Sequence, residues 1–569
     1  MKAHLQNIED IVGADNVSVQ EETTRLYSRD IAALPSLAFQ IIDNQFKIIT
    51  QPQTISSLTK LVKYAFEHRI PIVPRGSGTS GWGGALPTHG GICISTLHMS
   101  KFVHIDEYRM LVTVEAGMTW KELLVFLEQI GLTLPVYPSS ASAATIGGFA
   151  ASGGVGIGSA RYGDIRTQVA GIEGVIPNGM LVRLGEFALR ENDGLENIAD
   201  QGNKYLQEVL QKLPEDEKPE PMDLFLGLFG TFGIITRITL RVIPKLVLRT
   251  VVCIFDDIES LTCAIIDLSK ETQPYYMRFI TDTYTTKRFS PRSSIDEYGK
   301  FILTCAFLDT FYQIDEDLDM VKRIVEAHKG GITGEKRAQY HWDERLYPLR
   351  IKTLGPSLVP AEVIIPINQL PGLHKKIVDS IGMEAIAIEG TVSNDKTTSF
   401  LVWILDDERK KLSYTLGWHR SFDVASTAAK FDGLPYAVAL WNVPYADEFY
   451  GKKQKAALKK IKSQIDPRNL MNPLKVFGGR VVAKNKSLSL GFILGYLAAI
   501  AAQIVAPIIP GFEFLDILLW SGDSNIPPAF LISLVGGVFG FIFMKSLTLR
   551  QALRIGIPAL RIIRHLFRR

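Results

Sequence analysis

The chain has 569 residues, of which 46% are hydrophobic, and a formal net charge of +3. This length predicts several domains, and a mean hydropathy of +0.12 is high for a soluble enzyme. The four cysteines (Cys93, Cys253, Cys263 and Cys305) form no Cys-x-x-Cys pair, which argues against an iron–sulfur cluster, a zinc finger and a disulfide framework.

A Gly-rich loop stands out near the N-terminus. An amphipathic helix is predicted at residues 57–67, because its apolar side chains recur at helical spacing. It leads into a hydrophobic strand at 70–73. The loop follows at 73–84 with the sequence Val-Pro-Arg-Gly-Ser-Gly-Thr-Ser-Gly-Trp-Gly-Gly, and a second strand is predicted at 91–95.

This loop has two interpretations. Glycines tolerate positive φ and let backbone N–H groups approach a ligand, and successive N–H groups form a concavity that binds anions. Arg75 adds a charge that a phosphate can meet bidentately. The loop therefore favours a pyrophosphate cradle, and a Gly-rich hairpin without a ligand is the alternative. No Gly-Lys-Ser/Thr follows, and the next element is a strand, so neither a Walker loop nor a Rossmann fingerprint is present.

Strand and helix patterns alternate from here to about residue 244. A short strand is predicted at 111–115, and a capping box at 119–122 opens a helix that Gly131 closes. A second stretch rich in small residues spans 138–163. So many small side chains cannot build a core, and they indicate close approach of the backbone to a flat or extended ligand.

Five short motifs then occur in a fixed order. They are Pro-Arg-Gly-Ser-Gly-Thr at 74–79, Thr-Ile-Gly-Gly at 145–148, Arg-Tyr-Gly at 161–163, Gly-Thr-Phe-Gly-Ile at 230–234 and Asp-Pro-Arg-Asn-Leu-Met-Asn-Pro at 466–473. Over about residues 5–478 the chain thereby resembles the FAD-linked oxidases of the vanillyl-alcohol oxidase type. The branch is that of D-lactate dehydrogenase and the glycolate oxidase flavin subunit.

The resemblance implies an α+β fold and non-covalent FAD. A two-part FAD-binding domain of the PCMH (p-cresol methylhydroxylase) type would be followed by an α+β substrate cap domain. Relatives that attach FAD covalently through the Gly-rich loop have a histidine where Thr79 stands, and the residue before Gly230, usually acidic in this branch, is Phe229. The positions implied to contact FAD are Arg75, Gly76, Ser77, Gly78, Thr79, Ser80, Gly81, Pro138, Thr145, Gly147, Gly148, Ala151, Ser152, Gly153, Tyr162, Gly163, Ile172, Ile176 and Asn472.

The cap segment suggests a substrate site. Residues 342–345 (Trp-Asp-Glu-Arg) and 361–366 (Ala-Glu-Val-Ile-Ile-Pro) fit the family's substrate-side segment, where an arginine meets a carboxylate. Arg345 is therefore the candidate substrate-binding residue and Arg350 the fallback. A solvated surface arginine is the alternative for Arg345.

The chain departs from the dehydrogenase branch where that branch has its metal ligands and flavin-side histidine. The corresponding segments, near 388–394 and 431–436, contain no histidine, so we expect no metal. Oxidation of a hydroxyl needs a base for its proton. The candidates are His419, Glu389 and Tyr436, with His341 as a further possibility, and each histidine also has a purely structural interpretation.

Two C-terminal stretches predict a membrane hairpin. Residues 488–509 and 526–544 contain no charged residue, and each is long enough to cross a hydrocarbon core of about 30 Å. Lysines precede the first stretch, only acidic charges lie between the two, and only basic charges follow in 545–569. Basic flanks stay on the cytoplasmic side. We therefore expect a multi-pass protein of the cell (inner) membrane, with its catalytic part in the cytoplasm.

The tail at 545–569 is predicted to be a basic amphipathic segment that lies on anionic membrane lipids. It carries most of the excess positive charge, and residues 1–509 are close to neutral, which argues against a nucleic-acid partner. The predicted order of parts is the FAD-binding domain at 1–245, the cap at 246–440, helices returning to the FAD-binding domain at 441–480, transmembrane helices at 488–509 and 526–544, and the tail at 545–569.

Three functions remain open at this point. The first is a membrane-anchored FAD-dependent oxidoreductase that oxidises a small hydroxy acid or similar alcohol by hydride transfer to flavin N5 and passes electrons to quinone or to a partner protein. The second is a related enzyme acting on a lipid-linked alcohol or sugar. The third is a flavin-binding membrane protein that has lost its catalytic groups.

Overall fold

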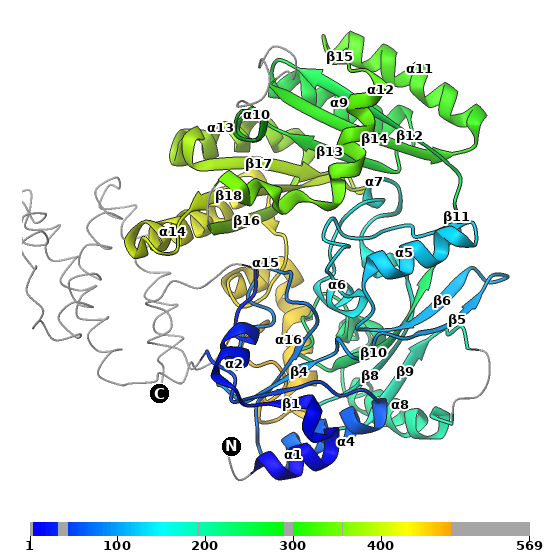
Figure 1. Ribbon diagram of the computed structural model, residues 1–569, viewed down its shortest axis with the longest axis vertical. Helices are drawn as coiled ribbons and strands as arrows, with labels where there is room; N and C mark the ends of the chain where they lie inside the picture. The colour runs from blue at the N-terminus through cyan, green and yellow to red at the C-terminus, as the bar shows by residue number, and fades with distance from the viewer. Residues whose placement is uncertain (1–3, 32–43, 190–193, 290–299, 355–356, 479–569) are drawn as a thin grey trace, which may run out of the picture. The chain divides into compact units, whose positions relative to one another are not determined.

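The computed structural model describes residues 4–31, 44–189, 194–289, 300–354 and 357–478 (Figure 1). The predicted spans at 488–509 and 526–544 and the tail at 545–569 lie outside the described residues. Within the described ranges, no helix combines the length and the apolar character that crossing a bilayer requires.

A four-stranded sheet forms the first part of the fold. Its order is β1 (Val17–Ser18), β2 (Ile48–Thr50), β4 (Ile92–Ser95) and β3 (Ile72–Arg75), and the last three strands run parallel. The predicted helix at 57–67 is α4 (Ile55–Glu67), and it begins two residues earlier because Thr54 and Ser57 form a capping box. Its buried face packs with α1 (Leu5–Val12) against this sheet.

An antiparallel five-stranded sheet forms the second part. Its order is β5 (Phe102–Asp106), β6 (Leu111–Glu115), β10 (Ile234–Arg241), β8 (Val169–Val175) and β9 (Leu181–Gly185). Helix α5 (Trp120–Gln129) begins at the predicted Thr119–Glu122 capping box. Helices α6 (Ile146–Ser152) and α8 (Glu196–Leu210), the short helix α7 (Ser159–Tyr162), and the pair β7 (Leu132–Thr133) and β11 (Ile243–Pro244) complete this part.

The third part is an eight-stranded antiparallel sheet (Figure 1). Its order is β15 (Gly331–Ile332), β12 (Val247–Phe255), β14 (Phe301–Asp309), β13 (Tyr276–Ile280), β17 (Ile386–Thr391), β18 (Thr397–Asp406), β16 (Ser357–Pro366) and β19 (Leu434–Pro435).

The two faces of this sheet have different partners, because side chains alternate along each strand. Val359, Ala361 and Val363 of β16 point to one face, which α9 (Ile258–Glu271), α11 (Phe311–Ala327), α13 (Leu370–Ile381) and α14 (Lys411–Ala428) cover. On the other face, α10 (Asp282–Phe289) and α12 (Glu335–Asp343) cover one region. Pro360 and Glu362 lie on this second face and line a cavity.

The chain then returns to the first two parts. Helix α15 (Ala446–Tyr450) leads to α16 (Lys452–Ile465), whose apolar side chains join the core beneath the five-stranded sheet. Lys462 Nζ donates hydrogen bonds to the carbonyl oxygens of Thr231 (2.6 Å) and Met471 (2.8 Å) and to Asp466 Oδ2 (2.7 Å). Met471 also bridges to Ile72 of β3. These contacts fix the end of the described chain behind the Gly-rich loop.

Candidate active site

A cavity lies between the Gly-rich segments of the first two parts and the open face of the eight-stranded sheet. The loop after β3 and the segments around α6 form one side. Side chains of β13, β16, β17 and β18 form the other. The first side is lined by Pro74–Trp82, Pro138–Ser140, Ala144, Thr145, Gly147–Phe149, Ala151, Ser152, Val155–Ile157 and Gly230. The second side is lined by Tyr276, Arg278, Arg345, Glu362, Glu389, Ser399, Leu401, Trp403 and Tyr436.

The Gly-rich loop begins where β3 ends, at Arg75. A Cβ on Gly76 would lie 2.2 Å from Thr145 Oγ1, so only glycine fits there. Gly78 has φ +71°, and a Cβ on it would lie 2.1 Å from Arg75 Nη2. The Arg75 guanidinium therefore supports the loop from beneath, and its Nη1 is buried without a hydrogen-bond partner among the described residues. A buried donor of this kind favours an anionic ligand.

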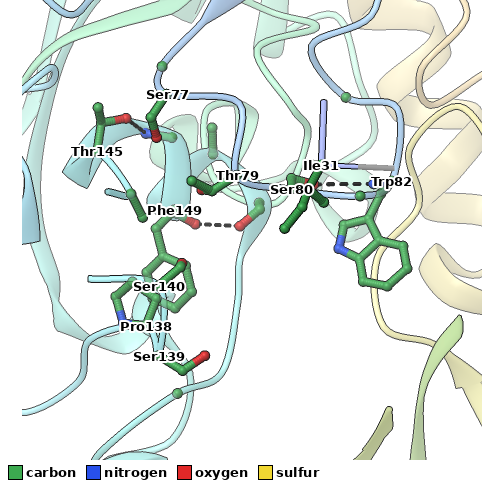
Figure 2. A pocket seen from close by; sticks show the side chains of 18 of the residues that line it. Ile31, Ser77, Thr79, Ser80, Trp82, Pro138, Ser139, Ser140, Thr145 and Phe149 are labelled. Atoms are coloured by element: carbon green, nitrogen blue, oxygen red, sulfur yellow. Dashed lines mark hydrogen bonds between the residues drawn. The ribbon is translucent and has the colours of Figure 1, made fainter. Parts of the chain in front are cut away.

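Helix α6 forms the neighbouring wall. Thr145 caps it, and its Oγ1 accepts a hydrogen bond from the Gly148 N–H at 3.2 Å. A Cβ on Gly147 would lie 2.6 Å from the Ala116 Cβ, so the helix packs directly on the end of β6. Figure 2 shows Thr145 and Ser77 close together on the two facing segments, with Thr79 further along the loop. The wall is thus made of small side chains and backbone.

Phe229, at the edge of the cavity, and Asn472, outside it, support the loop. Phe229 has φ +51°, and its ring packs against Gly84 and alanines of the segment after β19. Asn472 is buried, and its Nδ2 donates hydrogen bonds to the carbonyl oxygens of Gly84 (2.9 Å) and Phe229 (2.5 Å). The phenylalanine in place of the family's usual acidic residue is therefore a packing contact, although it also reaches the cavity edge.

A buried ion pair crosses the sheet face of the cavity. Arg278 on β13 donates to Glu389 Oε2 on β17 through Nε (2.7 Å) and Nη2. Trp403 Nε1 on β18 donates to Glu389 Oε1 at 2.6 Å. Both Glu389 oxygens are thus engaged, and the pair contributes no net charge to the cavity.

Glu362 is a second carboxyl group on this face, and its surroundings differ. It lies on β16 and partly faces the cavity. No cation of the described residues lies within salt-bridge distance of it. Burial raises the pKa of Glu362 to about 8, the nearby negative Glu389 adds to this rise, and the Ser399 hydroxyl opposes it.

Arg345 and Tyr436 complete the cap side of the cavity. The Arg345 guanidinium lies 3.9 Å from the centre of the Trp342 ring, and its Nε donates to Tyr137 Oη at 3.3 Å. Tyr436 Oη accepts a hydrogen bond from the Val155 N–H (2.8 Å) and donates to the Val155 carbonyl (3.2 Å). Tyr436 thus connects the cap to the wall opposite, and burial raises its pKa well above its usual range.

Several of the residues predicted from the sequence meet in this cavity. Glu389, Tyr436 and Arg345 line it, as do the loop residues from Arg75 to Gly81. Also present are Pro138, Thr145, Gly147, Gly148, Ala151 and Ser152.

Two of the predicted catalytic and substrate residues lie elsewhere. His419 is on α14, which covers the opposite face of the sheet, and its Nε2 lies 3.3 Å from Asp423 Oδ2. This placement argues against His419 as the base. Arg350 forms an ion pair with Glu344 and stacks on the Tyr347 ring at 4.6 Å, so it is not part of the lining.

Some positions expected to contact FAD also do not line the cavity. The side chains of Ile172 and Ile176 are buried in the core. Gly153 ends α6 in the left-handed conformation. Tyr162 packs edge-to-face on Tyr275. Gly163 follows α7 beside Asn394, and Asn472 acts through its hydrogen bonds to the loops, as described above.

Sequence reasoning missed Arg278, Glu362 and Trp403. One available signal was a charged residue within the apolar strand Leu-Val-Pro-Ala-Glu-Val-Ile-Ile (358–365), because such a charge needs a partner or a ligand. Among the described residues, no group of three or more His, Cys, Asp or Glu side chains is arranged to hold a metal ion.

Comparison with known families assigns both halves of the described chain. Residues 46–185 match the family described as "FAD binding domain". Residues 246–476 match the family described as "FAD linked oxidases, C-terminal domain".

Individual relatives are distant. The chain is 25% identical to glycolate oxidase subunit GlcD of Bacillus subtilis over 460 residues, covering 77% of this chain and 91% of that protein. It is 25% identical to the mitochondrial D-lactate dehydrogenase [cytochrome] of Arabidopsis thaliana, and the match covers 80% of this chain and 77% of that protein. The fold is similar to that of 4-ethylphenol oxidase from Gulosibacter chungangensis, with a TM-score of 0.69 and 16% identity. The match covers 84% of this chain and 97% of the oxidase. It is also similar to p-cresol methylhydroxylase, with a TM-score of 0.67 and 17% identity. That match covers 84% of this chain and 96% of the enzyme.

Proposed function

The chain belongs to the FAD-linked oxidases, with a PCMH-type FAD-binding domain followed by the C-terminal cap domain of that family, and from this premise we propose that it oxidises a 2-hydroxy acid. The observation that carries the proposal is Arg345, a guanidinium that lines the cavity from the cap side. The relatives named for glycolate and D-lactate support the same substrate class.

The first side of the cavity suits FAD. The tight contacts at Gly76 and Gly147 bring backbone close to the cavity, and the buried Arg75 Nη1 has an unused hydrogen. We propose that the loop from Arg75 to Gly81 holds the pyrophosphate. The loop contains neither histidine nor cysteine, so we expect it to form no covalent bond to FAD, and the FAD should be released by denaturation. When bound, FAD supplies the acceptor for the substrate's hydride.

Arg345 is suited to a carboxylate because its guanidinium is planar and offers paired donors. The Trp342 ring beneath it and the Tyr137 hydroxyl beside it fix its orientation. A substrate carboxylate on Arg345 places the adjacent hydroxyl-bearing carbon inside the cavity. A preoriented arginine loses little side-chain entropy on binding.

Anaerobic absorbance titration tests this proposal. The purified full-length protein is mixed with 2-hydroxy acids and with matched alcohols that lack the carboxylate, and bleaching of FAD is recorded. The 2-hydroxy acids are expected to bleach it and the matched alcohols are not. Arg345→Ala should weaken the acid's apparent affinity on the order of 10- to 100-fold, as expected for a charged hydrogen bond. Arg350→Ala, which removes an arginine outside the cavity, is the matched control. Lipid alcohols are included as a third group, and bleaching by them alone would contradict the proposal.

We also propose that the C-terminal region anchors the enzyme in the cell membrane and that quinone or an electron-transfer protein reoxidises the FAD. The uncharged stretches at 488–509 and 526–544 and their basic flanks support this. The full chain should remain with membranes after an alkaline carbonate wash, and a chain ending at residue 480 should be released. Release of the full chain would contradict the anchor.

A further inference from the structure

We infer that Glu362 is the residue that accepts the substrate's hydroxyl proton during oxidation, an assignment that rests on the proposed function. Three features support it: the position of Glu362 in the sheet, the hydrogen bonds that engage the other candidate bases, and its ionisation.

The position follows from strand register. Glu362 on β16 and Glu389 on β17 both pair with Leu401 of the intervening strand β18. Directly paired residues of antiparallel strands point to the same face, so the two carboxyl groups flank Leu401 on the cavity side. Glu362 also lies in one strand with the cavity-lining Pro360, two residues before it. The side chain is therefore fixed on a rigid sheet and faces the space that a substrate would occupy.

The other candidate bases are engaged. Glu389 accepts from Arg278 and Trp403 with its two oxygens. The Tyr436 hydroxyl forms two hydrogen bonds with Val155, and its raised pKa keeps it protonated at neutral pH. His419 lies on the far face of the sheet. By contrast, the Glu362 carboxylate makes no ion pair with another described residue, has the neutral Ser399 hydroxyl as a hydrogen-bond partner and partly faces the cavity.

The surroundings of Glu362 suit a base that works at mildly alkaline pH, where its carboxyl group is ionised. The charged and titratable groups that line the cavity with it are Glu389, Arg278, Tyr276, Tyr436, Arg345 and Arg75. The Arg278 charge is compensated by Glu389, so burial dominates and raises the pKa of Glu362 to about 8. A carboxylate of this pKa takes a proton more readily than an ordinary glutamate, whose pKa is about 4.3.

The step balances with FAD as the oxidant. The O–H bond of the substrate breaks and its proton goes to a Glu362 carboxylate oxygen. Bound FAD would supply the oxidant, taking the hydrogen of the adjacent C–H bond with its electron pair as hydride. The C=O bond forms, so the hydroxy acid becomes a 2-oxo acid, and Glu362 then returns its proton to solvent. The reaction requires ionised Glu362, and its rate should rise with pH.

Stopped-flow reduction of FAD in the full-length holoenzyme tests the inference. Wild type, Glu362→Gln, Glu362→Asp and the surface control Glu326→Gln are mixed anaerobically with the most effective 2-hydroxy acid from pH 6 to 10. The wild-type and control rate constants should rise with pH and level off above about pH 8. Glu362→Gln should lower the rate constant of FAD reduction on the order of 10²- to 10⁴-fold, which is the usual contribution of a general base. The rate constant of this variant should not rise with pH. Glu362→Asp should retain the rise.

Binding of the 2-oxo acid product, measured by calorimetry, separates the roles. A proton acceptor can be replaced by glutamine with less than a threefold change in this affinity. A Glu362→Gln variant that reduces FAD within fivefold of wild type would overturn the inference and leave the proposed function standing. The inference would also be overturned if Glu362→Gln lost affinity for the 2-oxo acid by the same factor as it lost rate. A wild-type protein that no 2-hydroxy acid reduces would overturn the proposed function itself, and the inference with it.

Discussion

Glu362 links the chemistry of the cavity to the stability of the protein. The pKa of Glu362 is about 8 in the folded state and about 4.3 for a glutamate in an unfolded chain. Between these values the folded state holds the proton and the unfolded state has lost it, so the free energy of unfolding falls as pH rises. The stabilisation is complete below about pH 4 and is lost as pH passes 8.

Glu362→Gln removes this titration and should therefore melt higher than wild type at pH 9, with a much smaller difference at pH 5. Melting temperatures of the FAD-bound proteins at the two pH values provide the measurement, with Glu326→Gln as the surface control. If the melting temperatures of Glu362→Gln and wild type differed by the same amount at both pH values, Glu362 would have the same pKa in the folded and unfolded states.

Gly76 sets how closely the loop approaches α6. Gly76→Ala places a Cβ 2.2 Å from Thr145 Oγ1, so either the loop or the N-terminal end of α6 must move. Since both line the proposed pyrophosphate site, the variant should lose most of its bound FAD during purification. Gly334→Ala is the matched control, because a Cβ there meets nothing within 4 Å. The FAD-to-protein absorbance ratio measures the outcome, and equal ratios for both variants would contradict the expected loss.

The place of the Gly-rich loop at the cavity could be predicted from the sequence because it depends on local backbone. The loop from Arg75 to Gly81 and the capping box at Thr119 are where the sequence placed them. Glu362 could not be assigned a role, since that depends on its register with Leu401 and Glu389, about 40 and 27 residues further along the chain. His419 was a candidate base from the sequence, but its helix, α14, covers the face of the sheet opposite the cavity.

At the scale of elements, strands β13, β17 and β18 are joined by the Arg278–Glu389–Trp403 cluster. Arg278→Met leaves the buried Glu389 without its counter-ion, which costs about 3–5 kcal/mol. The double variant Arg278→Met/Glu389→Gln removes both charges and should recover a large part of this loss. Arg409→Met breaks an exposed pair with Asp407 and should change the stability little, because solvent screens such a pair.

Chemical denaturation of the four proteins, followed by tryptophan fluorescence, tests the role of the cluster. If the double variant were less stable than Arg278→Met alone, the buried charge of Glu389 would not be the cause of the loss. The cluster also shows why the sheet face is polar here. The Arg278–Glu389–Trp403 cluster spans the neighbouring strands β13, β17 and β18, and β18 in turn pairs with β16, which carries Glu362.

At the scale of the whole molecule, the site is assembled from segments that lie far apart in the chain. Its lining begins with Ile31 and ends with Tyr436, and helix α16 returns to support the same loops through Lys462. The order of the Gly motifs was enough to predict the cofactor and the two-part fold. The cap could be predicted only as a region, because no local pattern reveals which face of its sheet is open.

The most direct test of the central claim is a single-turnover experiment on the full-length, FAD-bound protein. The protein is mixed anaerobically with a 2-hydroxy acid, the FAD absorbance is followed, and the 2-oxo acid is quantified after acid quench. Our account predicts one 2-oxo acid formed for each FAD reduced. FAD that dithionite reduces but no 2-hydroxy acid does, or FAD reduction without any 2-oxo acid, would contradict it.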